Sequence, residues 1–149
     1  EVGGEFTEQE KSGLKIFRNN CASCHKEPLF TSTDFKNNGL NVDSTLNDFG
    51  RMIITKKPQD SLKFKVPTLR NIQFTQPYMH DGRFETLQEV INHYTSGVLH
   101  SPTLANELQE PIILTHKEKL DLLVFLRTLT DQEFLYNKRF SYPSETRTN

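Results

Sequence analysis

The most constraining feature of the chain is the segment Cys21-Ala22-Ser23-Cys24-His25, which contains both of its cysteines. C-x-x-C-H is the attachment signal of haem c, in which the two thiols bond the two vinyl groups of one haem. The histidine that follows then lies beneath the iron as its proximal ligand. We therefore predict one covalently attached haem c, held by Cys21, Cys24 and His25.

Two other kinds of site use closely spaced cysteines. A redox dithiol has the same C-x-x-C spacing, but no β-α-β pattern surrounds this pair. A zinc site would need further ligands from the remaining histidines, because the chain has no second cysteine pair. Those histidines are His80, His93, His100 and His116. Haem attachment is the preferred interpretation.

Length and composition limit the architecture around this motif. The 149 residues suffice for a single domain with one core. Hydrophobic content is only 34%, so a bound haem would add apolar bulk that the chain lacks. The net charge of −1 argues against nucleic acid as a partner, because phosphate binding needs a basic excess. The longest apolar run, around 120–126, is interrupted by Asp121 and falls short of the roughly 20 residues of a membrane span.

Three segments are predicted to be helices, and each begins with a Thr-x-x-Glu capping box. The boxes start at Thr7, Thr86 and Thr115. The first helix runs to about residue 20, the second stops at Gly97, and the third ends near residue 130. A helix before the haem motif and another near the C-terminus predict an all-α, cytochrome c-like domain over residues 1–149.

The connecting segments carry weaker signals. Residues 31–67 and 98–112 are predicted to be loops, and strand signals are weak throughout. Pro67 is predicted to open a short helix through Arg70. The polar tail, about residues 135–149, is expected on the surface.

Several motifs then resemble one family. They are FKVPTLRN at 64–71, PYMHDG at 77–82, TLQEV at 86–90 and FLRTLTD at 125–131. In this order they resemble the C-terminal haem domain of bacterial di-haem cytochrome c peroxidases. The chain looks most similar to the subgroup that includes the di-haem enzyme of methylamine dehydrogenase maturation. The resemblance extends over about residues 8–143.

The resemblance implies a role in electron transfer. Family members have two haem domains, whereas this chain has one C-x-x-C-H motif and resembles only the second domain. In the family, electrons enter through that domain and pass to the peroxidatic haem of the first. The implied partner is a second haem domain or a redox protein. Two alternatives stay open: a peroxidase that reduces hydrogen peroxide at its own haem, and a haem-bearing subunit of a larger redox complex.

The usual location of this family and the maturation of haem c imply an exported, periplasmic protein. The first residues contain neither a basic region nor an apolar segment. We therefore expect either a cytoplasmic protein or one whose signal has been removed.

The sixth iron ligand decides the chemistry, because an open position binds peroxide and a filled one mainly transfers electrons. The candidates are Met52, Met79, His80, His93, Tyr94 and His100. At about 100° per residue from Leu87, Tyr94 lies near −20°, at the centre of the apolar face. His93 lies near −120°, at the margin of that face. Helix geometry therefore favours Tyr94, and the alternatives are Met79, an open site, or Tyr94 as a core aromatic.

The resemblance agrees with this choice and adds further expectations. It places the Met ligand of ordinary peroxidases, and the Tyr ligand of the maturation enzyme, at the position of Tyr94. Arg70 and Arg83 flank the PYMHDG turn and are candidate donors to the haem propionates. His80 is expected to form hydrogen bonds near the haem or the interface. The family also holds Ca²⁺ through backbone oxygens in a segment that corresponds to Thr75-Gln76-Pro77.

Overall fold

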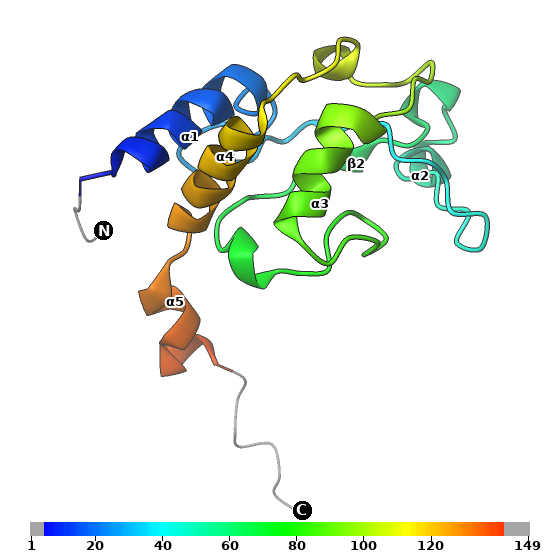
Figure 1. The fold of residues 1–149 in the computed structure, drawn as a ribbon. Helices are drawn as coiled ribbons and strands as arrows, with labels where there is room; N and C mark the ends of the chain where they lie inside the picture. Colours follow the sequence, from blue (N-terminus) through cyan, green and yellow to red (C-terminus); the bar gives the residue numbers. More distant parts are fainter. Residues whose placement is uncertain (1–4, 142–149) are drawn as a thin grey trace, which may run out of the picture.

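The computed structural model describes residues 5–141, and helices dominate this part of the chain (Figure 1). The α-helices are α1 (Glu8–Asn20), α2 (Met52–Thr55), α3 (Leu87–Asn92), α4 (His116–Thr128) and α5 (Gln132–Tyr136). A π-helical turn, η3 (His93–Gly97), continues α3. Short 3-10 helices are η1 (Pro58–Asp60), η2 (Ile72–Phe74), η4 (Asn106–Leu108) and η5 (Lys138–Phe140).

All three predicted capping boxes are present. In each, the N-cap threonine hydroxyl accepts from a backbone N–H, and the glutamate accepts from the threonine N–H. These N–H to carboxylate distances are 2.7 Å in α1, 2.8 Å in α3 and 2.7 Å in α4. Because a capping box satisfies two otherwise unpaired N–H groups, local sequence is enough to place these three helix starts.

Helices α1 and α4 lie side by side (Figure 1). They approach each other closely at Gly13, where a Cβ atom would lie 2.1 Å from the carbonyl oxygen of Asp121. The same atom would lie 2.6 Å from Cβ of Phe125. Only glycine allows the two backbones to come this close.

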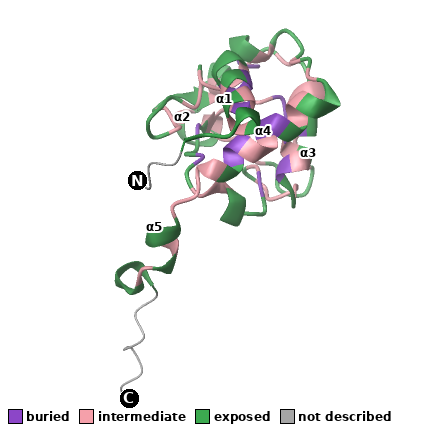
Figure 2. Ribbon diagram, turned by 60° about the vertical axis from the view of Figure 1, so that its left-hand side comes forward, coloured by how far each residue is buried: buried purple, intermediate pink, exposed green. Residues whose placement is uncertain are grey.

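Aromatic side chains fill the core beside this crossing. Phe17 is 0% exposed and Phe125 is 1% exposed, with their ring centroids 5.3 Å apart. Phe30, in the loop after the cysteine motif, packs on Phe17 at 5.5 Å. The buried faces of α1, α3 and α4 meet in this core (Figure 2). Its buried members are Ile16, Phe17, Leu69, Tyr78, Leu87, Ile91, Leu122, Phe125 and Leu126.

The fold departs from the predicted all-α class by one small sheet. Strands β1 (Phe35–Lys36) and β2 (Phe64–Lys65) pair antiparallel, with Phe35 opposite Lys65. Each strand has two residues, which is too short to produce an alternating sequence pattern. The described part is therefore mostly helical, with this sheet inside the segment predicted as loop.

The predicted short helix from Pro67 to Arg70 is wrong. These residues are non-helical because their backbone groups bond to the loop after the cysteine motif. The Pro67 carbonyl accepts from the His25 ring, and the Leu69 N–H donates to the Phe30 carbonyl at 3.2 Å. Contacts between segments distant in sequence thus replace the local helical bonds.

The chain leaves the compact body after α4. Helix α5 and η5 project away from it, as Figure 1 shows, and their residues are mostly exposed (Figure 2). Phe134 and Phe140 pack against each other with ring centroids 4.9 Å apart. The predicted surface tail is thus exposed as far as residue 141, and residues 142–149 lie outside the described part.

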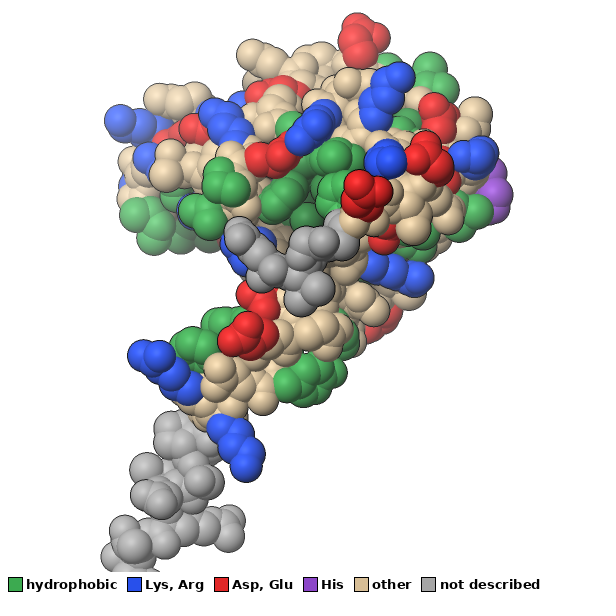
Figure 3. Space-filling view, turned by 90° about the vertical axis from the view of Figure 1, so that its left-hand side faces the viewer, with side chains coloured by type: hydrophobic (Ala, Val, Ile, Leu, Met, Phe, Trp, Pro, Cys, Tyr) green, Lys and Arg blue, Asp and Glu red, His purple; other side chains and the backbone are tan. Residues whose placement is uncertain are grey.

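The surface carries no dominant charge on the face that Figure 3 presents, where Lys and Arg alternate with Asp and Glu. Within residues 5–141, no helix is long and apolar enough to cross a membrane.

Candidate haem site

The cysteine motif follows directly from α1. The carbonyl of Phe17 accepts from the N–H groups of Cys21 at 2.7 Å and Ala22 at 3.1 Å. The His25 N–H in turn donates to the Cys21 carbonyl at 2.9 Å. This turn brings the two cysteines and the histidine together at the C-terminal end of α1, beside the aromatic core.

Both cysteines are free thiols. Burial raises the pKa of the Cys21 thiol to about 12, and burial also raises the pKa of Cys24. The thiols are therefore protonated at neutral pH and do not form a reactive thiolate pair. This environment argues against the redox dithiol considered above.

The His25 ring is oriented by two backbone carbonyls. Its Nδ1 lies 3.1 Å from the Pro67 oxygen and 3.3 Å from the Phe30 oxygen. Two acceptors at Nδ1 place the proton there and leave the Nε2 lone pair available to a metal. Burial lowers the pKa of His25, although both carbonyls oppose this, so the ring is held in its neutral, ligating form.

Tyr94 lies in η3, and its phenol lies near the thiols of Cys21 and Cys24. Burial is the main cause that raises the pKa of Tyr94, and the nearby Cys21 and Cys24 raise it further. Tyr94 also lines a cavity of about 200 Å³, together with Val98, His100, Leu108, Glu110 and Pro111 among others. The phenol of Tyr94 is thus close enough to the two thiols for their charges to affect its pKa, whereas the cavity itself extends toward residues 98–111.

His93 is buried, with 6% exposure, and its Nε2 lies 3.0 Å from the Asn38 carbonyl oxygen. The turn at residues 37–39 therefore covers the margin of the helix face on which His93 is predicted to lie. His93 also begins the π-helical turn. Gly97 ends this turn, where a Cβ would lie only 3.1 Å from Nδ1 of His93.

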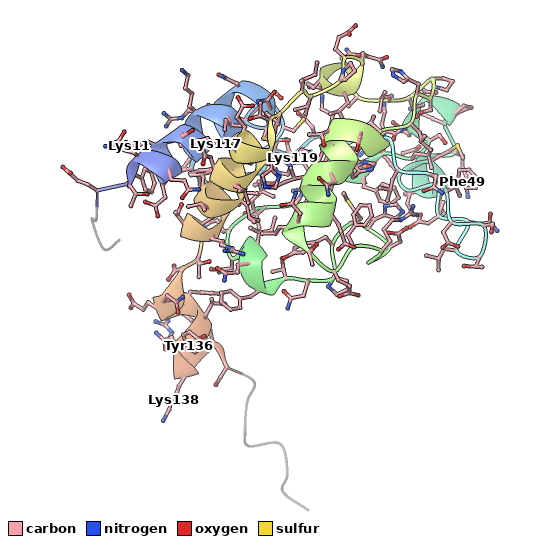
Figure 4. The ribbon with its side chains drawn as sticks, in the orientation of Figure 1. Lys11, Phe49, Lys117, Lys119, Tyr136 and Lys138 are labelled. Atoms are coloured by element: carbon pink, nitrogen blue, oxygen red, sulfur yellow. The ribbon has the colours of Figure 1, made fainter. Side chains whose placement is uncertain are left out.

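Helix α4 holds the π-helical turn in place. The Lys119 ammonium donates to the Asn92 side-chain oxygen at 3.0 Å and to the Thr95 hydroxyl at 2.8 Å. Figure 4 shows Lys119 on the side of α4 that faces α3. Side chains on both sides of Tyr94 are therefore hydrogen-bonded to α4.

Met79, the alternative ligand, is constrained by a residue that sequence analysis did not identify. Its backbone has a φ of 72°, and its sulfur lies 3.4 Å from Nδ2 of Asn38. The sequence marks residues 37–39 only as a turn, so no local signal indicates this contact.

The remaining predicted site residues are spread over the surface. Arg83 donates to the Asp81 carboxylate and to Asn41, whereas Arg70 lies 3.7 Å from Asp131 near α5. The two arginines therefore do not converge. His80 is exposed and its ring stacks on Phe64, with centroids 3.8 Å apart.

Other candidates lie at the start of α2 (Met52) and in exposed segments (His100 and His116). Thr75 and Pro77 are exposed, and the Thr75 hydroxyl donates to the Ile72 carbonyl at 3.2 Å. Among residues 5–141, no group of three or more His, Cys, Asp or Glu side chains is arranged to hold a metal ion. This disfavours the zinc alternative, while the Ca²⁺ site formed by backbone oxygens stays a prediction.

Comparison with known proteins decides the family, although no protein-family model matches the chain. The cytochrome-c peroxidase IdrP1 of Pseudomonas sp. (strain SCT) is 32% identical over 166 residues and 91% of this chain. The methylamine utilization protein MauG of Methylorubrum extorquens is 35% identical over 123 residues and 80% of this chain. A solved MauG-like protein associated with microbial copper homeostasis is 34% identical, with a TM-score of 0.77 over 96% of this chain. The chain belongs to the di-haem cytochrome c peroxidase family.

This confirms the family resemblance found in the sequence motifs. The di-haem peroxidase BthA from Burkholderia thailandensis E264 shares the fold at 23% identity, with a TM-score of 0.69. The chain spans 44% of the length of IdrP1, 34% of MauG and 53% of the MauG-like chain. It therefore corresponds to part of these family members.

The residues present fit the haem c of this peroxidase family. Two thiols three positions apart, not joined by a disulfide, would supply the thioether bonds, and His25 offers a neutral imidazole with a free Nε2. The Tyr94 phenol faces the same region. A haem-based redox role follows for the chain.

Proposed function

We propose that this chain is an electron-transfer domain whose haem c is attached at Cys21 and Cys24, with His25 and Tyr94 as axial ligands. The observation that carries the proposal is the orientation of His25, whose Nδ1 is held by two carbonyls so that Nε2 is available to iron. When bound, haem iron supplies a one-electron couple between its ferric and ferrous states.

The protein residues have separate tasks in this proposal. The Pro67 and Phe30 carbonyls would make His25 a stronger electron donor to iron by accepting hydrogen bonds from its Nδ1–H. Tyr94 would supply an anionic oxygen, which favours the ferric state and lowers the reduction potential. With both axial positions filled, the site exchanges electrons and leaves no position for peroxide.

The family relationship supports a direction of electron flow. The chain has one C-x-x-C-H motif and spans about a third to a half of its relatives. We infer that it corresponds to the C-terminal domain of these proteins, through which electrons enter. Its partner would then be a second haem domain or a redox protein, and its location the periplasm.

The test is the optical and EPR spectrum of the ferric holoprotein. We expect a six-coordinate haem with His/Tyr ligation, together with slow turnover of hydrogen peroxide. Tyr94→Phe keeps the ring but removes the ligating oxygen, so the iron should become five-coordinate or water-bound. Met79→Leu is the matched control and should leave the native spectrum unchanged.

Two results would contradict the proposal. If Tyr94→Phe leaves the spectrum unchanged and Met79→Leu abolishes the native low-spin signal, Met79 is the ligand. If the native protein shows an open ferric site and fast peroxide turnover, the alternative of a peroxidase acting at its own haem is correct.

A further inference from the structure

Asn38 joins three segments that the site depends on. Its Nδ2 lies 3.4 Å from the sulfur of Met79, and its carbonyl oxygen lies 3.0 Å from Nε2 of His93. Its own side-chain oxygen accepts from the Leu40 N–H at 3.4 Å. The side chain is thus held at both ends, beside the candidate ligand Met79.

We propose that Asn38 is a positioning residue that selects Tyr94 as the sixth ligand by holding the Met79 thioether in a hydrogen bond. The proposal deepens the function given above and rests on Tyr94 ligation. It assigns to the turn at residues 37–39 a role in ligand choice.

The physical basis is competition for the sulfur lone pairs. A thioether binds iron through the same lone pairs that accept a hydrogen bond, and it is a weak acceptor. The amide hydrogen bond therefore orients these lone pairs toward Asn38. Met79 itself sits at a φ of 72°, which non-glycine residues rarely adopt, so its backbone has few alternative positions.

The anchoring of Asn38 makes this restraint effective. His93 is buried and precedes Tyr94 in the π-helical turn, so its bond to the Asn38 carbonyl ties the turn at 37–39 to the backbone of Tyr94.

Two substitutions at this position test the proposal in the holoprotein. Asn38→Leu has a similar size but no donor, and Asn38→Ser is too short to reach the sulfur. The His93 contact uses the backbone carbonyl and is available in both variants. Asn106→Leu is the control, because Asn106 is an exposed asparagine at the start of η4, outside the segments that hold Met79 and Tyr94.

The readouts are the ferric spectrum and the midpoint potential. In Asn38→Leu and Asn38→Ser we expect part of the haem to show the red charge-transfer band of thioether-bound ferric iron, with a higher potential. Adding Met79→Leu to either variant should remove that band. Asn106→Leu should keep the native spectrum and potential.

A general loss of packing would not produce a signal that depends on Met79. The proposal is overturned if both Asn38 variants fold, as judged by far-UV circular dichroism, and keep the native spectrum and potential. It is also overturned if the new signal persists when Met79→Leu is added. Failure of Tyr94 ligation itself is recognised separately, because it appears in Tyr94→Phe while Asn38 is intact.

Discussion

Replacing Gly13 by alanine should destabilise the holoprotein, because the added Cβ would lie 2.1 Å from the Asp121 carbonyl oxygen. Contacts of a Cβ below 3.0 Å are essentially never seen, so α1 and α4 must separate by about 1 Å. A gap of that size loses a quarter to a half of the dispersion energy of each affected contact. The buried pair Phe17 and Phe125 lies at this crossing and would be affected first.

The expected magnitude is the difference between two effects. Overpacking costs about 3 kcal/mol at a backbone contact, whereas alanine in place of glycine stabilises a helix interior by about 1 kcal/mol. The net loss is about 2 kcal/mol, which lowers the Tm by about 4–8 °C for a chain of this length. Because α1 leads directly into Cys21, the haem spectrum should change as well.

The assay is guanidinium unfolding of the ferric holoprotein, followed in parallel by far-UV circular dichroism and haem absorbance. Lys11→Ala is the control, because Lys11 is an exposed residue of the same helix. Its effect on the free energy of unfolding should stay within about 0.5 kcal/mol. A Gly13→Ala variant as stable as the native protein would refute the close crossing of α1 and α4 at this residue.

Three further outcomes are expected. Native mass spectrometry should show one covalent haem and no free thiol at Cys21 or Cys24; bound zinc or two free thiols would exclude the haem assignment. Thr86→Ala should remove the α3 capping box and cost about 1 kcal/mol in thermal unfolding, and an unchanged Tm would contradict this. The Lys36–Glu107 pair has a Nζ–Oε1 distance of 2.7 Å, and its hydrogen bond lowers the pKa of Glu107 and raises that of Lys36. The contribution of this pair to the free energy of unfolding is up to about 1 kcal/mol. It should be lost as pH falls through the folded pKa of Glu107, or as pH rises through the folded pKa of Lys36. In Glu107→Gln, the free energy of unfolding measured with denaturant should change less with pH than it does in the native protein.

The haem motif and the three main helix starts could be predicted because their physical causes are local. Cys21, Cys24 and His25 act within one turn, and a capping box needs only four consecutive residues. Helix α2 (Met52–Thr55), by contrast, lies inside the segment predicted as loop, and only its end just before Lys56-Lys57-Pro58 has a local cause.

The short helix predicted at 67–70 shows where local reasoning fails. Proline at a first helical position is a real preference, but the Pro67 carbonyl is used by His25, 42 residues earlier in the chain. The pairing of the two-residue strands β1 and β2 likewise depends on how the fold brings distant segments together, because so short a segment carries no periodic sequence pattern.

The sequence by itself determined the starts of the three main helices, because each capping box needs only four consecutive residues. It also determined the family, through motifs spread along the chain, and predicted the haem-attachment motif at residues 21–25. Tertiary structure alone decided the surroundings of Tyr94, the proposed sixth ligand, because the turn at residues 37–39 covers His93 and contacts Met79, 41 residues after Asn38. Ligand choice depends on distances between atoms of separate segments, and those distances exist only once the core between α1, α3 and α4 has formed.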